Sequence, residues 1–83
     1  MIHFTGEAWD HYLYWQTTDK KMLKRVNQLI KDCLRDPFVG LGKPEPLKRD
    51  LAGLWSRRID NVHRLVYKYE NNELYVISCR FHY

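Results

Sequence analysis

LWSRRIDNVHRLVYKYENNELYVISCRFHY, residues 54–83, supplies most of the sheet. Apolar and polar side chains alternate in three runs within it, and successive side chains of a strand point to opposite faces. The runs predict strands over 54–59, 64–69 and 74–82. Asp60-Asn61 and Asn71-Asn72 fall between the runs, and such pairs favour tight turns. The stretch therefore predicts an antiparallel meander whose last strand reaches His82.

Helical periodicity precedes the meander. Thr5 is expected to cap a first helix that ends near Thr17-Thr18. Asp19 is expected to cap a second helix that stops before Asp36-Pro37, because the residue before a proline disfavours helical geometry. The apolar stripe of this second helix has helical spacing and consists of Met22, Val26, Leu29, Ile30 and Cys33.

Short strands are also expected over 2–5 and 47–51. Together these elements predict an α+β fold in which two N-terminal helices pack on a twisted, mainly antiparallel sheet of four to five strands. The length of 83 residues fits a single domain over 1–83.

The net charge is +4 and the sequence pI is about 9.2. Residues 43–83 hold eight Lys and Arg against five Asp and Glu, and they also hold the aromatic strands, a combination that suits nucleic acid. The two cysteines, Cys33 and Cys79, form no metal-binding pattern, and no apolar run is long enough to span a bilayer. We therefore expect a cytoplasmic protein without metal, cofactor or membrane partner.

Strand alternation divides the side chains of the meander between two faces. In the last strand, the set that begins at Tyr75 and ends at Phe81 is expected to pack under the helices. Arg57 is expected to point inward, near an edge or a bulge. The opposite, open face is expected to hold Arg58, Arg64, Lys68, Arg80 and His82.

The segment 36–46 is predicted to be the long loop of the chain. It is rich in glycine and proline, and loops of this length are often functional. Pro44 and Pro46 flank Glu45 and stiffen the backbone around its carboxylate.

Three kinds of side chain suffice to cleave RNA. The ribose 2′-hydroxyl is the nucleophile, so a base must remove its proton, a cation must stabilise the charged transition state, and an acid must protonate the departing 5′-oxygen. Carboxylate, guanidinium and imidazole groups suit these roles. Such groups are supplied by Glu45, Arg58, Arg64 and His82. Each residue alone is also compatible with an ordinary structural role, as a solvated carboxylate, an exposed or ion-paired arginine or a terminal histidine, so the residues by themselves leave both interpretations open.

Five segments follow one another in the order and spacing of a known family. They are WDHYLYWQ (9–16), GKPEPLK (42–48), LWSRRI (54–59), HRLVY (63–67) and CRFHY (79–83). In these segments the chain resembles the YoeB toxins, the Txe/YoeB branch of the RelE superfamily of type II toxin–antitoxin systems. The resemblance covers essentially the whole chain.

The resemblance implies a RelE-like fold, akin to small microbial ribonucleases. It also implies a ribosome-dependent endoribonuclease that cuts mRNA in the A site and so inhibits translation. The implied partners are the ribosome, mRNA, a cognate YefM-like antitoxin and, through the toxin–antitoxin complex, operator DNA. The family also allows a homodimer.

The resemblance further implies a role for each site residue. Glu45 would be the general base, Arg64 the transition-state stabiliser and His82 the general acid. Lys48 and Arg58 would bind phosphate, and Tyr83 would position the RNA. The carboxylate after Tyr83 is expected to favour the charged form of the neighbouring imidazole.

Two alternatives use the same basic face. One is a non-catalytic RNA- or DNA-binding module, for which Glu45 would be dispensable. The other is an inactive toxin relative that acts in operon repression with its antitoxin. Growth arrest on expression, lost in variants of Glu45 and His82, would separate the enzyme from both.

Overall fold

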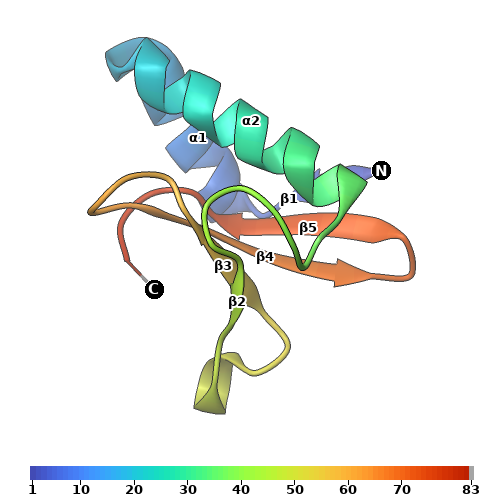
Figure 1. Cartoon of the computed structure of the whole chain (residues 1–83). Helices are drawn as coiled ribbons and strands as arrows, with labels where there is room; N and C mark the ends of the chain where they lie inside the picture. The colour runs from blue at the N-terminus through green and yellow to red at the C-terminus, as the bar shows by residue number, and fades with distance from the viewer. Residues whose placement is uncertain (83) are drawn as a thin grey trace.

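Two helices cover one face of a five-stranded sheet in the computed structural model, which describes residues 1–82 (Figure 1). The strand order is β1-β5-β4-β3-β2; β1 and β5 are parallel, and the other neighbours are antiparallel. The elements are β1 Ile2–Phe4, α1 Gly6–Thr18, α2 Lys20–Arg35, β2 Glu45–Pro46, the 3₁₀ helix η1 Arg49–Leu51, β3 Trp55–Arg58, β4 Arg64–Glu70 and β5 Glu73–Ser78. The predicted α+β fold is confirmed.

Both predicted helix caps are present. The Thr5 hydroxyl accepts the backbone N–H of Ala8 at 3.0 Å and begins α1. The Asp19 carboxylate accepts the N–H groups of Lys21 and Met22 at 3.1 and 3.2 Å and begins α2. These bonds satisfy backbone donors that have no partner within the helix, and they explain why two helices follow each other without a linker.

The core lies between the helices and the sheet. The inward side chains of β4 and β5 are fully buried against the apolar stripe of α2. The central members of this layer are the strand residues Leu65, Tyr67, Leu74 and Val76 and the α2 residues Val26, Leu29 and Cys33. Each large apolar side chain removed from water stabilises the fold by about 1.5–3 kcal/mol, so this layer fixes which face of the sheet remains for a site.

The side chains of β5 point to the opposite faces of the sheet from those predicted. Asn71 and Asn72 have φ angles of 54° and 63°, as the central residues of a type I′ turn require. This two-residue turn pairs Tyr69 with Leu74. Leu74 therefore faces the helices, and Tyr75 lies on the open face opposite its partner Lys68. Turn geometry, rather than the count of apolar residues, sets the register.

The last strand is shorter than predicted, because β5 ends at Ser78. An extra residue stands in β5 where Val66 pairs with Ser78 but Tyr67 pairs with Val76. Such a bulge interrupts strand alternation. The chain then bends, and Phe81 adopts a φ of 67°, so alternation no longer predicts where side chains after Ser78 point.

The strand expected over 47–51 is displaced toward the N-terminus. The pairing that does form is β2, in which Glu45 lies opposite Ser56, and the chain then turns into η1. In Figure 1, β2 and η1 extend from the side of the sheet away from the helices. Across residues 1–82 no helix has the length and apolar character that a membrane span requires.

Candidate functional site

A carboxylate and two guanidinium groups meet on the open face of the sheet. Arg58 of β3 is the direct register partner of Arg64 of β4, and directly opposed residues share a face. Glu45 of β2 lies opposite Ser56, two residues before Arg58, and therefore shares that face. Its Oε1 atom lies 3.2 Å from Nη1 of Arg64. The sheet register thus brings together three of the predicted site residues.

The exposure of these groups differs. The Arg64 side chain is 18% exposed and the Glu45 side chain 51%, so the pair stands at the surface with the guanidinium more enclosed. Arg58 is exposed. A solvated carboxylate is accessible to a substrate proton, and two neighbouring cations attract an anion. The geometry suits a phosphate.

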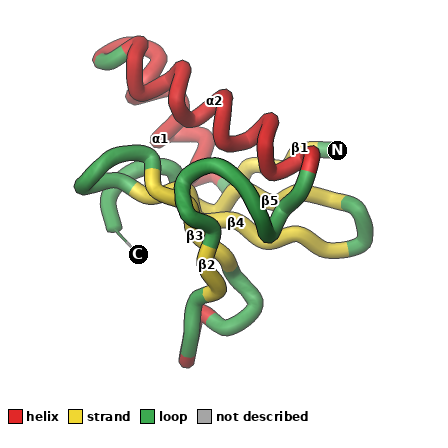
Figure 2. The backbone as a smooth tube through the Cα atoms, in the orientation of Figure 1, coloured by secondary structure: helices red, strands yellow, loops and turns green. Residues whose placement is uncertain are grey.

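Arg57 holds the loop that leads to Glu45. This loop runs between α2 and β2 (Figure 2). Its side chain is 0% exposed, as predicted for an inward position. Nη1 lies 2.6 Å from Oδ2 of Asp32 and donates to the carbonyl oxygen of Leu41 at 3.1 Å, while Nη2 donates to that of Asp36 at 2.6 Å. One buried guanidinium therefore binds the loop backbone at its start and again at Leu41.

Tyr67 supports the same loop from β4. Its hydroxyl accepts from Nε of Arg57 at 3.1 Å and donates to the carbonyl oxygen of Pro37 at 2.6 Å. Burial raises the pKa of Tyr67 to about 12, so the hydroxyl keeps the proton that it donates.

Asp32 supplies the negative charge. Its carboxylate accepts from Nε of Arg35 at 2.9 Å, from the backbone N–H of Leu41 at 2.9 Å and from Arg57. These donors hold the pKa of Asp32 well below its usual range. We call Asp32, Arg35, Arg57 and Tyr67 the Arg57 network.

Gly42 lets the loop return to the sheet. Its carbonyl oxygen accepts the N–H of Arg58 at 2.7 Å. Its φ is 77°, and a Cβ atom would lie 2.9 Å from the carbonyl oxygen of Arg58 and 3.0 Å from Leu29. The GKPEPLK segment therefore needs glycine at this position for both backbone conformation and space.

Lys48 follows Glu45 along the same segment and is exposed. It lines a shallow hollow of about 320 Å³ together with Glu45, Pro46, Leu47 and Leu51. The structure thus places the predicted phosphate-binding lysine beside the predicted base.

The segment that leads to His82 is bonded to the start of β4. The N–H of Arg64 donates to the carbonyl oxygen of Phe81 at 3.0 Å, and the N–H of Phe81 donates to Nδ1 of His63 at 2.7 Å. His82, the next residue, is exposed. The chain therefore brings His82 to the Arg64 end of the site. Tyr83 lies outside the described residues.

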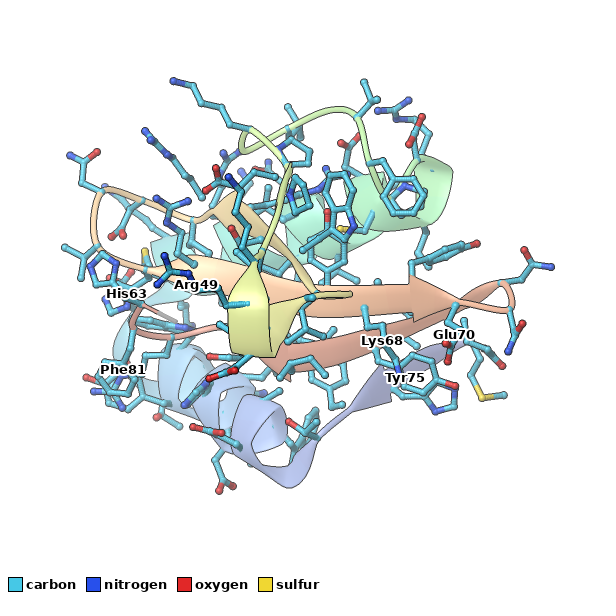
Figure 3. All side chains as sticks on the ribbon, turned by 90° about the horizontal axis from the view of Figure 1, so that it is seen from below. Arg49, His63, Lys68, Glu70, Tyr75 and Phe81 are labelled. Carbon is cyan, nitrogen blue, oxygen red and sulfur yellow. The ribbon has the colours of Figure 1, made fainter. Side chains whose placement is uncertain are left out.

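Two of the basic residues predicted for the open face, Lys68 and Arg80, lie away from the site. Lys68 does lie on that face, but its Nζ is 3.5 Å from Glu70 and 5.0 Å from the ring centre of Tyr75. Figure 3 shows these three residues at the opposite end of the sheet from His63 and Phe81.

Arg80 does not lie with the site cations, because the chain bends after Ser78. Its guanidinium carbon stands 3.5 Å from the ring centre of Tyr14 in α1. The predicted row of five basic residues is therefore wrong at Arg80, and Lys68 is distant from the site.

Comparison with known proteins identifies the family. The model of the YoeB-like toxin of bacterial type II toxin–antitoxin systems matches residues 4–83. The chain belongs to the YoeB toxin family. It is 60% identical to toxin YoeB of Synechocystis over 99% of this chain and 95% of that protein. A solved YoeB/ParE toxin from Agrobacterium tumefaciens is 52% identical, with a TM-score of 0.97 over 99% of this chain and 98% of the other.

YoeB toxins have also been solved in assemblies. A YoeB–YefM complex from Staphylococcus aureus contains a toxin chain 44% identical to this one, with a TM-score of 0.94 over 100% of this chain and 97% of that one. A YoeB dimer from the same organism is 46% identical, with a TM-score of 0.92 over 99% of this chain and 95% of the other. The Mycobacterium tuberculosis RelBE2 complex, at 24% identity and a TM-score of 0.72, shows the RelE-type fold alone.

In this YoeB-family toxin, the arrangement offers an accessible carboxylate next to a partly enclosed guanidinium, with a second guanidinium opposite. Such a set can accept a proton at Glu45 and stabilise negative charge between Arg58 and Arg64. A base and a stabilising cation are two of the three groups that cleavage of RNA through its 2′-hydroxyl needs.

Sequence reasoning missed two supports of the YoeB-family site. The Arg57 network was invisible because Asp32 lies on a helix 25 residues before Arg57, although an arginine at an inward strand position is itself a signal. The bond from Phe81 to His63 was also missed. The adjacency of His63 and Arg64 was the available clue.

Proposed function

We propose that this YoeB-family toxin is a ribosome-dependent endoribonuclease that cuts mRNA in the ribosomal A site and thereby inhibits translation. The observation that carries the proposal is the 3.2 Å contact between Glu45 and Arg64, with Arg58 directly opposite Arg64 on the same face. The contact puts a carboxylate that can accept a proton beside a cation that can stabilise negative charge on a phosphate.

The proposed chemistry follows from these positions. Glu45 removes the proton from the 2′-hydroxyl, and the 2′-oxygen attacks the adjacent phosphorus. Arg64 stabilises the charge that develops on the phosphate oxygens, while Lys48 and Arg58 bind phosphate. The bond from phosphorus to the 5′-oxygen breaks, and His82 protonates the leaving oxygen. The products are a 2′,3′-cyclic phosphate and a 5′-hydroxyl, and Tyr83 positions the RNA.

The proposal includes partners. A YefM-like antitoxin is proposed because a YoeB relative has been solved with YefM. A homodimer is proposed because a YoeB relative has been solved as a dimer. The ribosome, mRNA and, through the antitoxin complex, operator DNA complete the set, and the cytoplasm is the proposed compartment. Residues 1–83 act as one toxin domain.

Mapping of mRNA 5′ ends after a brief induction tests the function. We expect new ends at ribosome-occupied codons, and none when Glu45→Gln is induced at the same level. Intact transcripts with the unsubstituted chain, together with operator binding in the presence of antitoxin, would instead identify the inactive relative.

A further inference from the structure

We propose that His11 and His63 are positioning residues that hold the segment 79–82 against the site by accepting its backbone N–H groups. The N–H of Phe81 donates to Nδ1 of His63 at 2.7 Å, and the N–H of Cys79 lies 3.3 Å from Nδ1 of His11. This inference rests on the proposed role of His82 as the general acid. It assigns a task to two histidines that take no part in the proposed chemistry.

The segment needs such acceptors because the sheet no longer supplies them. β5 ends at Ser78, so Cys79 and Phe81 are beyond its ladder. Phe81 has a φ of 67°, a conformation that an L-residue keeps only when its surroundings impose it. Imidazole acceptors replace the missing strand partners at alternate residues of the segment.

The Phe81 peptide is held at both of its polar atoms. Its N–H goes to the side chain of His63, while its carbonyl oxygen accepts the N–H of the adjacent Arg64. The carbonyl oxygen of Cys79 accepts from Nε1 of Trp15 at 2.8 Å. These bonds fix the position of the segment relative to Arg64. A shift of the Phe81 peptide would therefore move His82 relative to Arg64, the proposed transition-state stabiliser.

Aromatic packing orients both imidazoles. The ring centre of His63 lies 4.9 Å from Trp15 and 6.2 Å from Phe81, and that of His11 lies 5.7 Å from Phe81. Figure 3 shows His63 and Phe81 at the same end of the sheet. Because the rings are packed, neither imidazole can present its other nitrogen without repacking.

Each acceptor nitrogen requires a neutral ring with its proton on Nε2. In His11 that Nε2 atom lies 3.9 Å from a carboxylate oxygen of Glu7. Burial lowers the pKa of His11, which favours the neutral ring. The charged groups around His11 are Glu7, Asp10, Arg80 and His63.

The titratable groups around His63 are Asp60 and His11. Trp15 and Phe81 flank its ring, and the carboxylate of Asp60 accepts its backbone N–H at 2.6 Å. A proton on Nδ1 would point a donor at the donor N–H of Phe81. A ring that carries its proton on Nδ1 therefore could not hold the segment.

Substitution of His63 by asparagine or by leucine distinguishes the effect of the hydrogen-bond acceptor from the effect of side-chain volume. The Oδ1 atom of Asn branches from Cγ as Nδ1 does in histidine, so His63→Asn keeps the acceptor without titrating. His63→Leu keeps the volume and removes the acceptor. His3→Asn is the matched control, since His3 stacks on Tyr75 and lies near Glu73, away from the site.

Single-turnover cleavage on programmed ribosomes is the functional readout. We expect His63→Leu to lower the cleavage rate constant at least tenfold with ribosome affinity unchanged within about twofold. We expect His63→Asn to recover to within about threefold of the wild-type rate constant. Full activity in His63→Leu, or equal losses in the Leu and Asn variants, would overturn the inference.

The tautomer is measured on the free protein by ¹⁵N chemical shifts, independently of activity. We expect Nδ1 of His11 and His63 to show an unprotonated nitrogen that couples to the N–H of Cys79 and Phe81, with amide exchange of Phe81 accelerated in His63→Leu. A protonated Nδ1 would overturn the inference that the two imidazoles accept these N–H groups. A wild type that forms these hydrogen bonds but cuts no RNA would overturn the proposed function, and with it the positioning role.

Discussion

Arg58 and Arg64 are directly opposed on neighbouring strands, so their two guanidinium groups project from the same face of the sheet. Like charges in this arrangement destabilise a sheet. The Glu45 carboxylate, 3.2 Å from Arg64, offsets part of the repulsion. A bound phosphate would offset more, so an anion that binds here is expected to stabilise the fold.

Replacing Arg58 should separate these two effects. Arg58→Ala is expected to raise the free energy of unfolding by about 0.2–1 kcal/mol, because it removes a like-charge pair, and to weaken RNA binding with a shallower salt dependence. Urea unfolding and binding titrations at several salt concentrations measure both. Lys68→Ala is the control, since Lys68 pairs with Glu70 away from the site. An unaltered salt slope in Arg58→Ala would contradict the assignment.

Glu45→Gln keeps the shape of the side chain and removes its basicity. If Glu45 is the base, single-turnover cleavage should fall by about 10²- to 10⁴-fold while ribosome binding changes little. Rapid-quench kinetics with saturating ribosomes give the rate constant directly. Activity that survives this substitution would mean that another group accepts the proton.

The nucleophile can be removed from the substrate instead of the enzyme. An mRNA with one 2′-deoxyribose at the scissile position is expected to bind as the all-ribose mRNA does and to remain uncut. Chelation of divalent ions after ribosome assembly should leave the chemical step unaffected. Cleavage of the deoxy substrate would rule out attack by the 2′-oxygen.

The Arg57 network predicts a pH dependence of stability. Donors from Arg35, Leu41 and Arg57 lower the pKa of Asp32, so its contribution is present above the unfolded pKa of about 4 and is lost as pH falls toward the folded value. Asp32→Asn should therefore be less stable than wild type at pH 7, with the gap closing below about pH 4. Thermal unfolding between pH 2 and 7 measures this gap.

Arg57→Met tests the same network from its cationic side. It removes one of the three donors to the Asp32 carboxylate and the guanidinium donor to two loop carbonyl groups. Removal of one partner from a buried pair costs about 3–5 kcal/mol, so urea unfolding should shift strongly. A loss below about 1 kcal/mol would show that the loop does not depend on Arg57.

Glycine substitutions distinguish strain from crowding. Gly42→Ala meets both, with a φ of 77° and a Cβ position 2.9 Å from the carbonyl oxygen of Arg58, and should cost about 1–3 kcal/mol. Gly53→Ala meets only strain, since its φ is 96° and no atom lies within 4 Å of the new Cβ. Gly42→Ala should also slow cleavage, while Gly53→Ala should not. Equal effects would attribute the cost to φ alone.

Local signals predicted the elements that depend on local chemistry. Thr5 and Asp19 cap the helices as expected because capping involves residues two or three positions apart. The meander followed from period-two alternation, and the register of β3 on β4 placed Arg58 and Arg64 together as alternation required.

Alternation failed where distant residues decide the backbone. The bulge opposite Val66 and Tyr67 and the left-handed Phe81 depend on β4, His11 and His63, and nothing within 74–82 announces them. Likewise, the partner of Arg57 lies on a helix and could not be paired with it from strand patterns. The placement of Arg80 was wrong for this reason, whereas Glu45 was singled out by its flanking prolines, which are a local signal.

The parallel pairing of β1 with β5 has a kinetic consequence. Ile2 lies opposite Leu74, so this edge of the sheet closes only when residues 72 positions apart have met. Loop closure over such a separation is slow compared with helix or hairpin formation. The segment 79–82 also depends on α1, because Trp15 and His11 bind Cys79 across 64 and 68 positions of the chain. The site is therefore completed late in folding, and the first appearance of cleavage after dilution from denaturant would time the final step of refolding rather than its onset.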